Sequence, residues 1–267
     1  MVELDNSVQQ PGRRRKRAEL KELVLEAGFQ VLVREGLDIG VDHVNYTKVF
    51  EHLEATKGVR VTRGSVHERI WDSQRDFQLD LVKRAAEWVH HNSTEAVIDA
   101  SADVVAAADF TTHAGRDRAI GELCRVLGRV NIEMSEQDDL WYLWQGVVSA
   151  FSVTRNREEE VEAVRTSVLA TYASISERLE GFYRLMMDTV GLEPRADLFA
   201  SADDAITEFT MQATAMADGW SLRRRFQPEE ARLFMLPTGP DGELQEWDHF
   251  SFGVVSLIRG FFVNPPD

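Results

Sequence analysis

Apolar residues recur at steps of three and four along most of this chain, and this spacing restricts the fold more than any other feature. The longest such run, from Val161 to Val190, keeps its apolar side chains on one stripe of a helix of about 45 Å. Gly191 and Pro194 are placed to end that helix. Since no segment shows a convincing strand alternation, we expect an all-α fold, with further helices near 73–91, 93–108, 115–134, 137–153, 202–225 and 246–263.

The first part of the chain carries the start and stop signals of short helices. Gly36 and Gly58 are positioned to end a first helix, which begins near Arg17, and a second one, because glycine tolerates a positive φ. Thr62 is a plausible N-cap for a third helix. Ser73 and the acidic residue three positions later form a capping-box pattern ahead of a fourth helix.

Charge is distributed unevenly over the 267 residues, whose net charge is −15. Residues 13–84 contain 15 Lys and Arg against 12 Asp and Glu, whereas residues 85–267 carry −16. The basic part can approach a phosphate backbone from which the acidic part is repelled. An acidic body is also an ordinary means of keeping a protein in solution, so the asymmetry alone carries little weight.

Cysteine content and hydropathy predict the compartment. The single cysteine, Cys124, excludes an intrachain disulfide and a cysteine-rich zinc site, which fits a reducing cytoplasm. No apolar run approaches the roughly 20 residues that cross a bilayer, and the N-terminus lacks the apolar core of a signal peptide. We therefore expect a cytoplasmic protein that does not enter membranes.

Motifs for catalysis, cofactors or metals are not found in the sequence. There is no phosphate-cradling glycine loop, no nucleophile elbow and no paired Cys/His framework. The neighbouring His90 and His91 point to different sides of a helix, which makes a poor chelate even with Glu95 nearby. Asp138 and Asp139 lack a second acidic motif at suitable spacing. We expect no enzymatic activity, no cofactor and no metal.

Several segments, taken in order, resemble the TetR family of one-component transcriptional regulators. Residues 24–36 are similar to that family's first helix, and 62–67 to the start of its recognition helix, with His67 in place of the usual tyrosine. Residues 71–77 match the aromatic and capping segment that follows in the family. Residues 217–223 resemble its penultimate helix, which typically pairs subunits. The resemblance is strong over residues 18–84 and diffuse beyond them.

This resemblance implies a homodimeric, ligand-responsive regulator, most simply a repressor that a small apolar effector releases from a pseudo-palindromic operator on double-stranded DNA. It implies a basic arm over 1–17, a helix-turn-helix domain over 18–84 and an effector-binding and dimerisation domain over 85–267. An all-α enzyme or small-molecule carrier with an incidental basic arm is the alternative. The expected dimer surface comprises the helix at 202–225 and a terminal segment with Trp247, Phe250, Phe252, Val254, Val255, Leu257, Ile258 and Phe261.

The residues expected to bind DNA lie in the arm and in the helix-turn-helix segment. Arginine can form two hydrogen bonds with the edge of a guanine, and hydroxyl groups can hydrogen-bond to bases or phosphates. A basic arm is attracted by the negative electrostatic potential of the minor groove. The alternatives are a solubilising tail for the arm and an ordinary polar helix face for the rest. The candidates are Arg13, Arg14, Arg15, Lys16, Arg17, Thr47, Lys48, Arg60, Thr62, Arg63, Gly64, Ser65, His67, Arg69 and Ser73.

Aromatic and sulfur-containing residues in the second part of the chain are candidates for an effector pocket. Aromatic walls bury a large area, and methionine adapts to irregular ligands. For any one of these residues, a place in the ordinary core is the more frequent outcome. The candidates are Trp88, Met134, Trp141, Trp144, Phe151, Tyr172, Phe182, Tyr183, Met186 and Met187.

Overall fold

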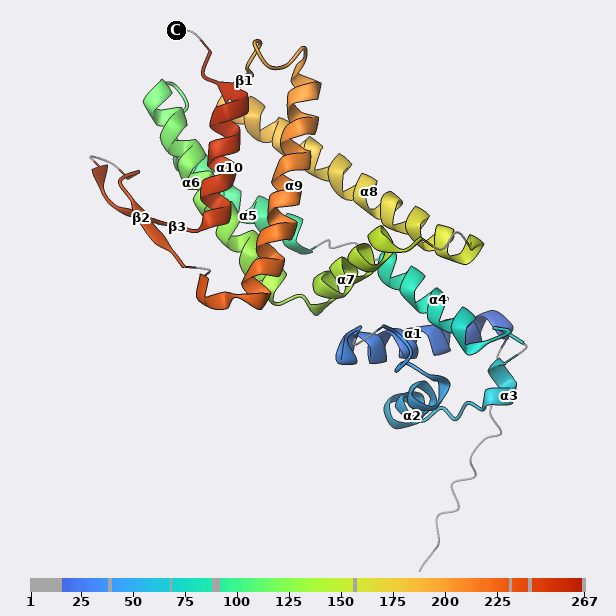
Figure 1. Ribbon diagram of the computed structural model, residues 1–267. Coiled ribbons are helices and arrows are strands. Elements are labelled where there is room, and N and C mark those ends of the chain that lie inside the picture. The colour runs from blue at the N-terminus through green and yellow to red at the C-terminus, as the bar shows by residue number, and fades with distance from the viewer. Residues whose placement is uncertain are drawn as a thin grey trace, which may run out of the picture. The chain divides into compact units, whose positions relative to one another are not determined.

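The computed structural model describes residues 16–37, 40–67, 69–87, 92–155, 158–230, 232–239 and 242–265. The chain divides into two compact units, Met1–Arg84 (unit 1) and Ala85–Asp267 (unit 2). Both units are built mainly from helices, so the prediction of an all-α fold is confirmed (Figure 1). Within the described residues, every helix is too short or too polar to cross a membrane.

Unit 1 is formed by helices whose ends follow the signals in the sequence (Figure 1). Gly36 and Gly58 end the first two helices with φ of 76° and 61°. Asn45 caps the second helix, because its side chain accepts a hydrogen bond of 3.1 Å from the backbone N of Lys48. The helices are α1 (Arg17–Glu35), α2 (Tyr46–Lys57), α3 (Arg63–Val66) and α4 (Gln74–Ala86).

The core of unit 1 brings α1 and α4 into close contact at Gly28. A Cβ atom added there would lie 2.8 Å from Cζ of Phe77 and 2.9 Å from Cδ2 of Leu81. The Phe77 ring also meets Trp71 and Tyr46, with centroid separations of 5.0 and 5.1 Å. This buried cluster fixes where the chain enters α4, and so positions the residues just before it.

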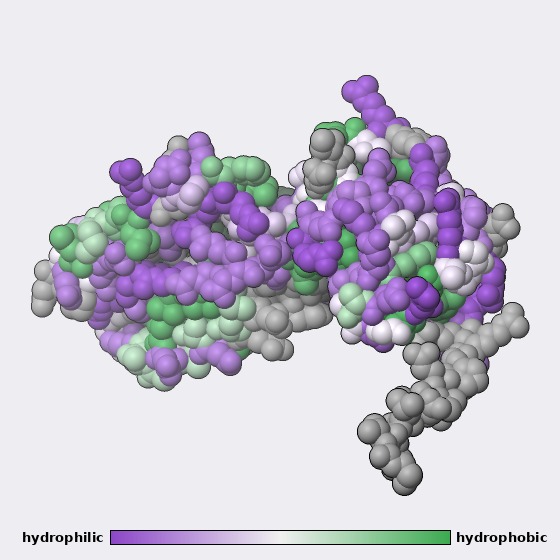
Figure 2. All heavy atoms as spheres, turned by 90° about the horizontal axis from the view of Figure 1, so that it is seen from below, coloured by the Kyte–Doolittle hydropathy of each residue, from purple (hydrophilic) through white to green (hydrophobic). Residues whose placement is uncertain are grey.

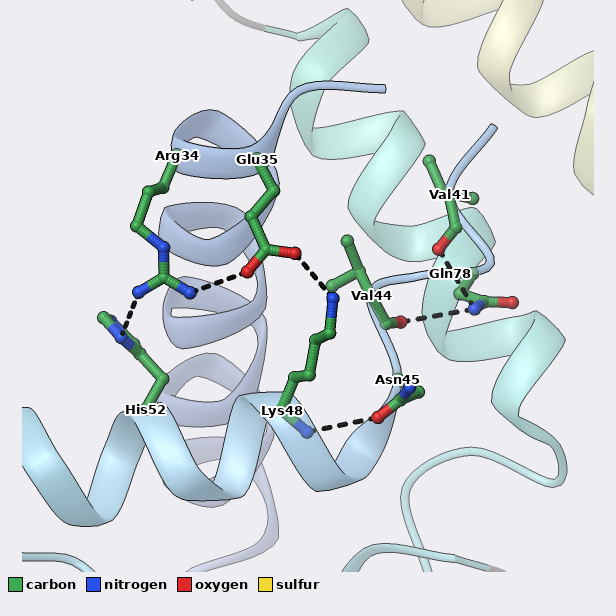
Figure 3. A network of polar contacts seen from close by, with 8 residues as sticks. All are labelled: Arg34, Glu35, Val41, Val44, Asn45, Lys48, His52 and Gln78. Carbon is green, nitrogen blue, oxygen red and sulfur yellow. Dashed lines mark hydrogen bonds and ion pairs between the residues drawn. The ribbon is translucent and has the colours of Figure 1, made fainter. Parts of the chain in front are cut away.

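A polar network on the surface of unit 1 joins α1 to α2 (Figure 3). The Glu35 carboxylate lies 2.8 Å from Nζ of Lys48 and 2.8 Å from a guanidinium nitrogen of Arg34. A second Arg34 nitrogen lies 3.5 Å from Nδ1 of His52. On the other side of the same region, Nε2 of Gln78 donates to the carbonyl of Val44 at 3.2 Å, which holds the loop before α2.

This network predicts a pH dependence of stability. The hydrogen bonds from Lys48 and then from Arg34 lower the pKa of Glu35 from 4.5 to about 2. Since the folded-state pKa is the lower one, the stabilisation is present above pH 4.5 and is lost as the pH falls towards 2. It amounts to at most about 1 kcal/mol, because water screens pairs at the surface.

Amide hydrogen exchange of α1 and α2 in the full chain, compared with Glu35→Gln at each pH, measures this contribution. The wild type is expected to be better protected than the variant above pH 4.5 and equal to it near pH 2. A difference that did not change with pH would contradict the assignment to Glu35.

Unit 2 is a bundle in which α6 packs against α5 and α10, and α9 packs against α8 and α10 (Figure 1). The long stripe of the sequence becomes a single helix, α8, which ends at Gly191 with φ of 77°, as predicted. The elements are α5 (Asn92–Ala107), α6 (His113–Glu136), α7 (Asp139–Val153), α8 (Glu159–Val190), α9 (Ala202–Phe226), the 3-10 helix η1 (Pro228–Glu230) and α10 (His249–Phe261).

Two small antiparallel pairs of strands accompany the helices, and the expectation of no strand was wrong in this respect. Strand β1 (Glu193–Pro194) pairs with β4 (Phe262–Val263), and β2 (Phe234–Leu236) pairs with β3 (Gln245–Trp247). Strands of two or three residues are too short to show an alternating pattern, so the sequence gives no sign of them.

The core of unit 2 takes up most of the terminal segment that was expected to pair subunits. Trp247, Phe250, Val255 and Ile258 are buried within the unit, so a second copy of the chain cannot contact them. Phe252 is exposed, and Val254, Leu257 and Phe261 are partly buried. The apolar spacing of this segment is therefore explained by packing inside the chain.

Candidate functional site

The exposed turn formed by α3 holds the central residues of the candidate DNA-binding surface. Thr62, Arg63 and Gly64 are exposed, and Val66 anchors the turn in the core. A Cβ atom at Gly64 would meet nothing within 4 Å, so packing inside the chain does not require glycine there. Ser65 is occupied locally, since its Oγ donates to the Thr62 carbonyl at 2.6 Å. Arg63 and Gly64 are thus the parts of the turn most open to a partner.

The third helix, which begins after Thr62 as predicted, is short. It covers a single turn, and the backbone becomes extended at His67, with φ of −63° and ψ of 137°. The chain must leave the helix there to bury Trp71, whose Nε1 donates to Oδ2 of Asp80 at 2.7 Å. His67, a candidate DNA contact, is partly buried, with its Nδ1 atom enclosed. Arg69 is exposed, but it follows the helix instead of extending it.

The other basic candidates of unit 1 differ in their solvent exposure and in their contacts within the chain. Lys16 and Arg17 are exposed at the start of α1, whereas Arg13, Arg14 and Arg15 lie outside the described residues. Arg60 is 83% exposed, and its ion pair with Glu54 is long at 3.5 Å, so this contact holds it weakly. These exposed cations extend the charged surface around α3.

Two predicted phosphate contacts are engaged inside the unit. Lys48 forms the ion pair with Glu35, so its charge is already matched, while the neighbouring Thr47 is exposed. Ser73 caps α4 together with Asp76. The Asp76 backbone N donates to Oγ of Ser73 at 3.2 Å, and the Ser73 backbone N donates to the Asp76 carboxylate at 2.8 Å. The predicted capping box is therefore confirmed, and Ser73 serves the helix itself.

Unit 2 contains a cavity of about 170 Å³ whose walls come from α5, α6, α7, α8, α9 and α10. An apolar cavity of about 150 Å³ is large enough for benzene in other proteins, so a compact organic molecule fits. Most of the lining is apolar. Its polar members are Asn131, Ser135, Ser176, Arg178, Thr214 and Asp218, besides the aromatic residues described next.

Most of the predicted effector-binding residues line this cavity. Met134 and Phe151 do not belong to the described lining, and Trp88 lies outside the described residues. Those that line it are Trp141, Trp144, Tyr172, Phe182, Tyr183, Met186 and Met187.

The aromatic residues gather in one part of the cavity, next to a carboxylate. The rings of Trp141 and Trp144 stack with centroids 5.3 Å apart, and Trp144 meets Tyr172 edge to face at 4.8 Å. The Tyr172 hydroxyl donates to Oδ2 of Asp218 at 3.3 Å. Asp218 is an acid on the face of α9 that lines the cavity, between Thr214 and the end of the helix.

Burial shapes the electrostatics of Asp218. Removal from water raises the pKa of its carboxyl group to about 6, although interactions with Gln145 and Tyr172 lower it. The Nε2 atom of Gln145 is itself buried and finds no partner with good hydrogen-bond geometry among the described residues. The sequence analysis did not identify Asp218, because residues 217–223 were assigned to subunit pairing. The sequence feature that could have indicated it is an acidic residue among small residues on an otherwise apolar helix face.

Metal ligands do not gather in the part of the chain that the structure describes: no three His, Cys, Asp or Glu side chains there could share an ion. Asp138 acts as the N-cap of α7 and accepts hydrogen bonds from the backbone N of Leu140 at 2.9 Å and of Trp141 at 3.2 Å. The chain matches no protein-family model, and no curated protein is significantly similar to it. Its function therefore has to be argued from these two sites.

Proposed function

We propose that this protein is a ligand-responsive DNA-binding regulator of transcription, in which unit 1 contacts the duplex and unit 2 binds an effector. The observation that carries the proposal is the exposed turn of α3, which presents Arg63 and Gly64 on a rigid support. Among the described residues, no contact requires a glycine at position 64, and its missing side chain leaves the backbone open. A partner that approaches the backbone closely, as DNA does, would explain the glycine.

The fixed geometry of α3 suits recognition of a groove. Val66, the last residue of α3, and Trp71, which follows the turn, are both buried, so the core holds the α3 backbone. Arg63 can then reach a guanine edge without a large loss of backbone entropy. The exposed cations at Lys16, Arg17 and Arg60 would neutralise phosphates nearby, which contributes affinity rather than sequence selectivity.

The cavity supports the regulatory half of the proposal. A molecule enclosed by six helices can favour one arrangement of them over another. Such a ligand shifts DNA affinity only by its difference in affinity for the two arrangements. The cavity alone would equally suit a small-molecule carrier, which is the alternative function, so DNA binding decides between the two.

A homodimer belongs to the proposal, because two copies would contact two half-sites of an operator. The exposed apolar surface that could pair two copies of the chain is smaller than the sequence suggested. Met211 on α9 and Phe252 on α10 are exposed apolar residues. On the face shown in Figure 2, hydrophilic residues predominate and apolar residues form separate patches. Sedimentation at several concentrations tests this part, and a strictly monomeric chain bound to DNA would remove it.

The DNA contact predicts a loss of affinity when Arg63 is replaced. Sequences selected from random or genomic DNA by the full chain provide the ligand, and fluorescence anisotropy at several salt concentrations measures affinity. Arg63→Ala is expected to weaken binding by about 1–3 kcal/mol, or roughly fivefold to more than a hundredfold, and to relax the sequence preference.

A matched arginine in unit 2 serves as the control. Arg195 is partly exposed and paired with Asp197, so Arg195→Ala should leave DNA affinity unchanged. Undiminished affinity of a folded Arg63→Ala variant would remove α3 from the interface. If the wild type showed no sequence-selective, salt-dependent binding, the carrier function would be favoured instead.

A further inference from the structure

The cavity of unit 2 contains an unusual combination of groups for an apolar binding site. Its wall carries one carboxylate, Asp218, within a hydrogen bond of Tyr172. Tyr172 in turn packs on Trp144, which stacks on Trp141. A negative charge and three electron-rich rings are thus contiguous in one part of the wall.

The charge of Asp218 is not matched by a cation in the part of the chain that the structure describes. Among the residues that the structure describes, no Lys or Arg forms an ion pair with Asp218, and no positive charge contributes to its pKa shift. Arg178 also lines the cavity, but it lies six residues beyond Tyr172 on α8, about 9 Å along the axis. A carboxylate that is largely removed from water without a counter-charge is costly, and such groups concentrate at functional sites.

We propose that the cavity binds an organic cation, with its ammonium group against Asp218 and the Tyr172 and Trp144 rings and its apolar body among the remaining lining. The carboxylate supplies the counter-charge, and the rings attract a cation through their negative faces. The apolar wall accepts the hydrocarbon part of the same molecule. This assigns a ligand class to the effector of the proposed regulator and rests on that proposal only for its effect on DNA.

The other ionisable groups of the lining do not compete for this role. Burial raises the pKa of Tyr172, Tyr183 and Cys124, so these groups stay neutral near neutral pH. Asn131 and Ser135 on α6 are polar but do not ionise. Within the described lining, Asp218 is therefore the group that changes charge in the weakly acidic range.

Three one-ring probes that differ in charge test the proposal on the full chain without DNA: benzylamine, benzyl alcohol and benzoate. Calorimetry is expected to show benzylamine, which is protonated at neutral pH, binding roughly tenfold or more tightly than the alcohol, with benzoate weakest. Its affinity should decline as the pH is lowered through about 6, where Asp218 becomes neutral. Equal affinities for the amine and the alcohol, a preference for benzoate, or no saturable binding of benzylamine would each overturn the proposal.

Two asparagine variants on the same helix separate the charge of Asp218 from its shape. Asp218→Asn keeps the size and hydrogen-bonding capacity of the side chain, and it should reduce benzylamine affinity to that of benzyl alcohol. Asp203→Asn changes an exposed acid in the first turn of α9 and should leave both affinities unchanged. Loss of the preference in both variants, or in neither, would overturn the assignment to Asp218.

The outcome is independent of the DNA experiment. A preference for the cation in a chain that does not bind DNA would support the ligand class and reject the regulator. DNA binding without a preference for the cation would support the regulator and reject the ligand class. If both hold, benzylamine at saturating concentration should change the affinity of the wild type for its selected DNA, and Asp218→Asn should abolish that change.

Discussion

Replacement of Phe209 by alanine is expected to lower the free energy of unfolding of unit 2 by about 3–5 kcal/mol. The Phe209 side chain is fully buried where α9 faces the rest of the unit. Its ring meets Tyr183 edge to face with centroids 4.8 Å apart, and it meets Phe262 at 6.0 Å. The variant leaves a void that these rings cannot close without losing contacts of their own.

Urea unfolding followed by tryptophan fluorescence measures this effect, since five of the six tryptophans lie in residues 85–267. Met211→Ala provides the control, because Met211 is on the same helix but 56% exposed. Its effect should be within about 0.5 kcal/mol. A change below about 1 kcal/mol for Phe209→Ala would show that the core of unit 2 is not packed around this ring.

The second large effect is expected where α6 and α10 approach one another at Gly128. A Cβ atom added to Gly128 would collide with Oγ of Ser251 and lie 3.0 Å from its Cβ and 3.1 Å from its Cα. A rotamer change of Ser251 can move Oγ away, but it leaves the close approach to Cβ and to Cα, which belongs to the backbone of α10. Gly128→Ala should therefore destabilise unit 2 by about 1–3 kcal/mol, despite the better helix propensity of alanine.

A glycine on α8 provides the matched control, for which the change in the free energy of unfolding should have the opposite sign. A Cβ atom at Gly181 would meet nothing within 4 Å, so Gly181→Ala should stabilise the protein by up to about 1 kcal/mol. Both variants are compared by urea unfolding. Ser251→Gly in the Gly128→Ala background should recover part of the loss in a double-mutant cycle. Equal effects of the two alanines would mean that helix propensity, not the contact, decides.

The elements that depend on local signals were predicted from the sequence. Gly36, Gly58 and Gly191 end their helices with positive φ, and the serine–aspartate box opens α4. These positions need only neighbouring residues to specify them, because a helix end is set by its own caps. The apolar stripe of α8 belongs to the same class, since its spacing is fixed by the helix period.

The features that depend on distant contacts were not predicted. Helix α3 ends early because Trp71 is buried against Phe77. The apolar residues of the terminal segment pack into the core of unit 2 instead of forming a surface for a second subunit. The position of Asp218 beside Tyr172 joins residues 46 apart in the chain. Spacing along a helix shows which residues share a face, but it does not show which other helix that face will meet.

The cavity also contains the only thiol of the chain, Cys124, which is buried and has its pKa raised to about 12 by desolvation. A protonated, enclosed sulfur reacts slowly with alkylating reagents, because only the thiolate is a strong nucleophile. The rate at which Cys124 is alkylated therefore reports how often the helices around it open transiently. A bound ligand that keeps these helices closed would slow the alkylation, so ligand occupancy could be followed without introducing any label.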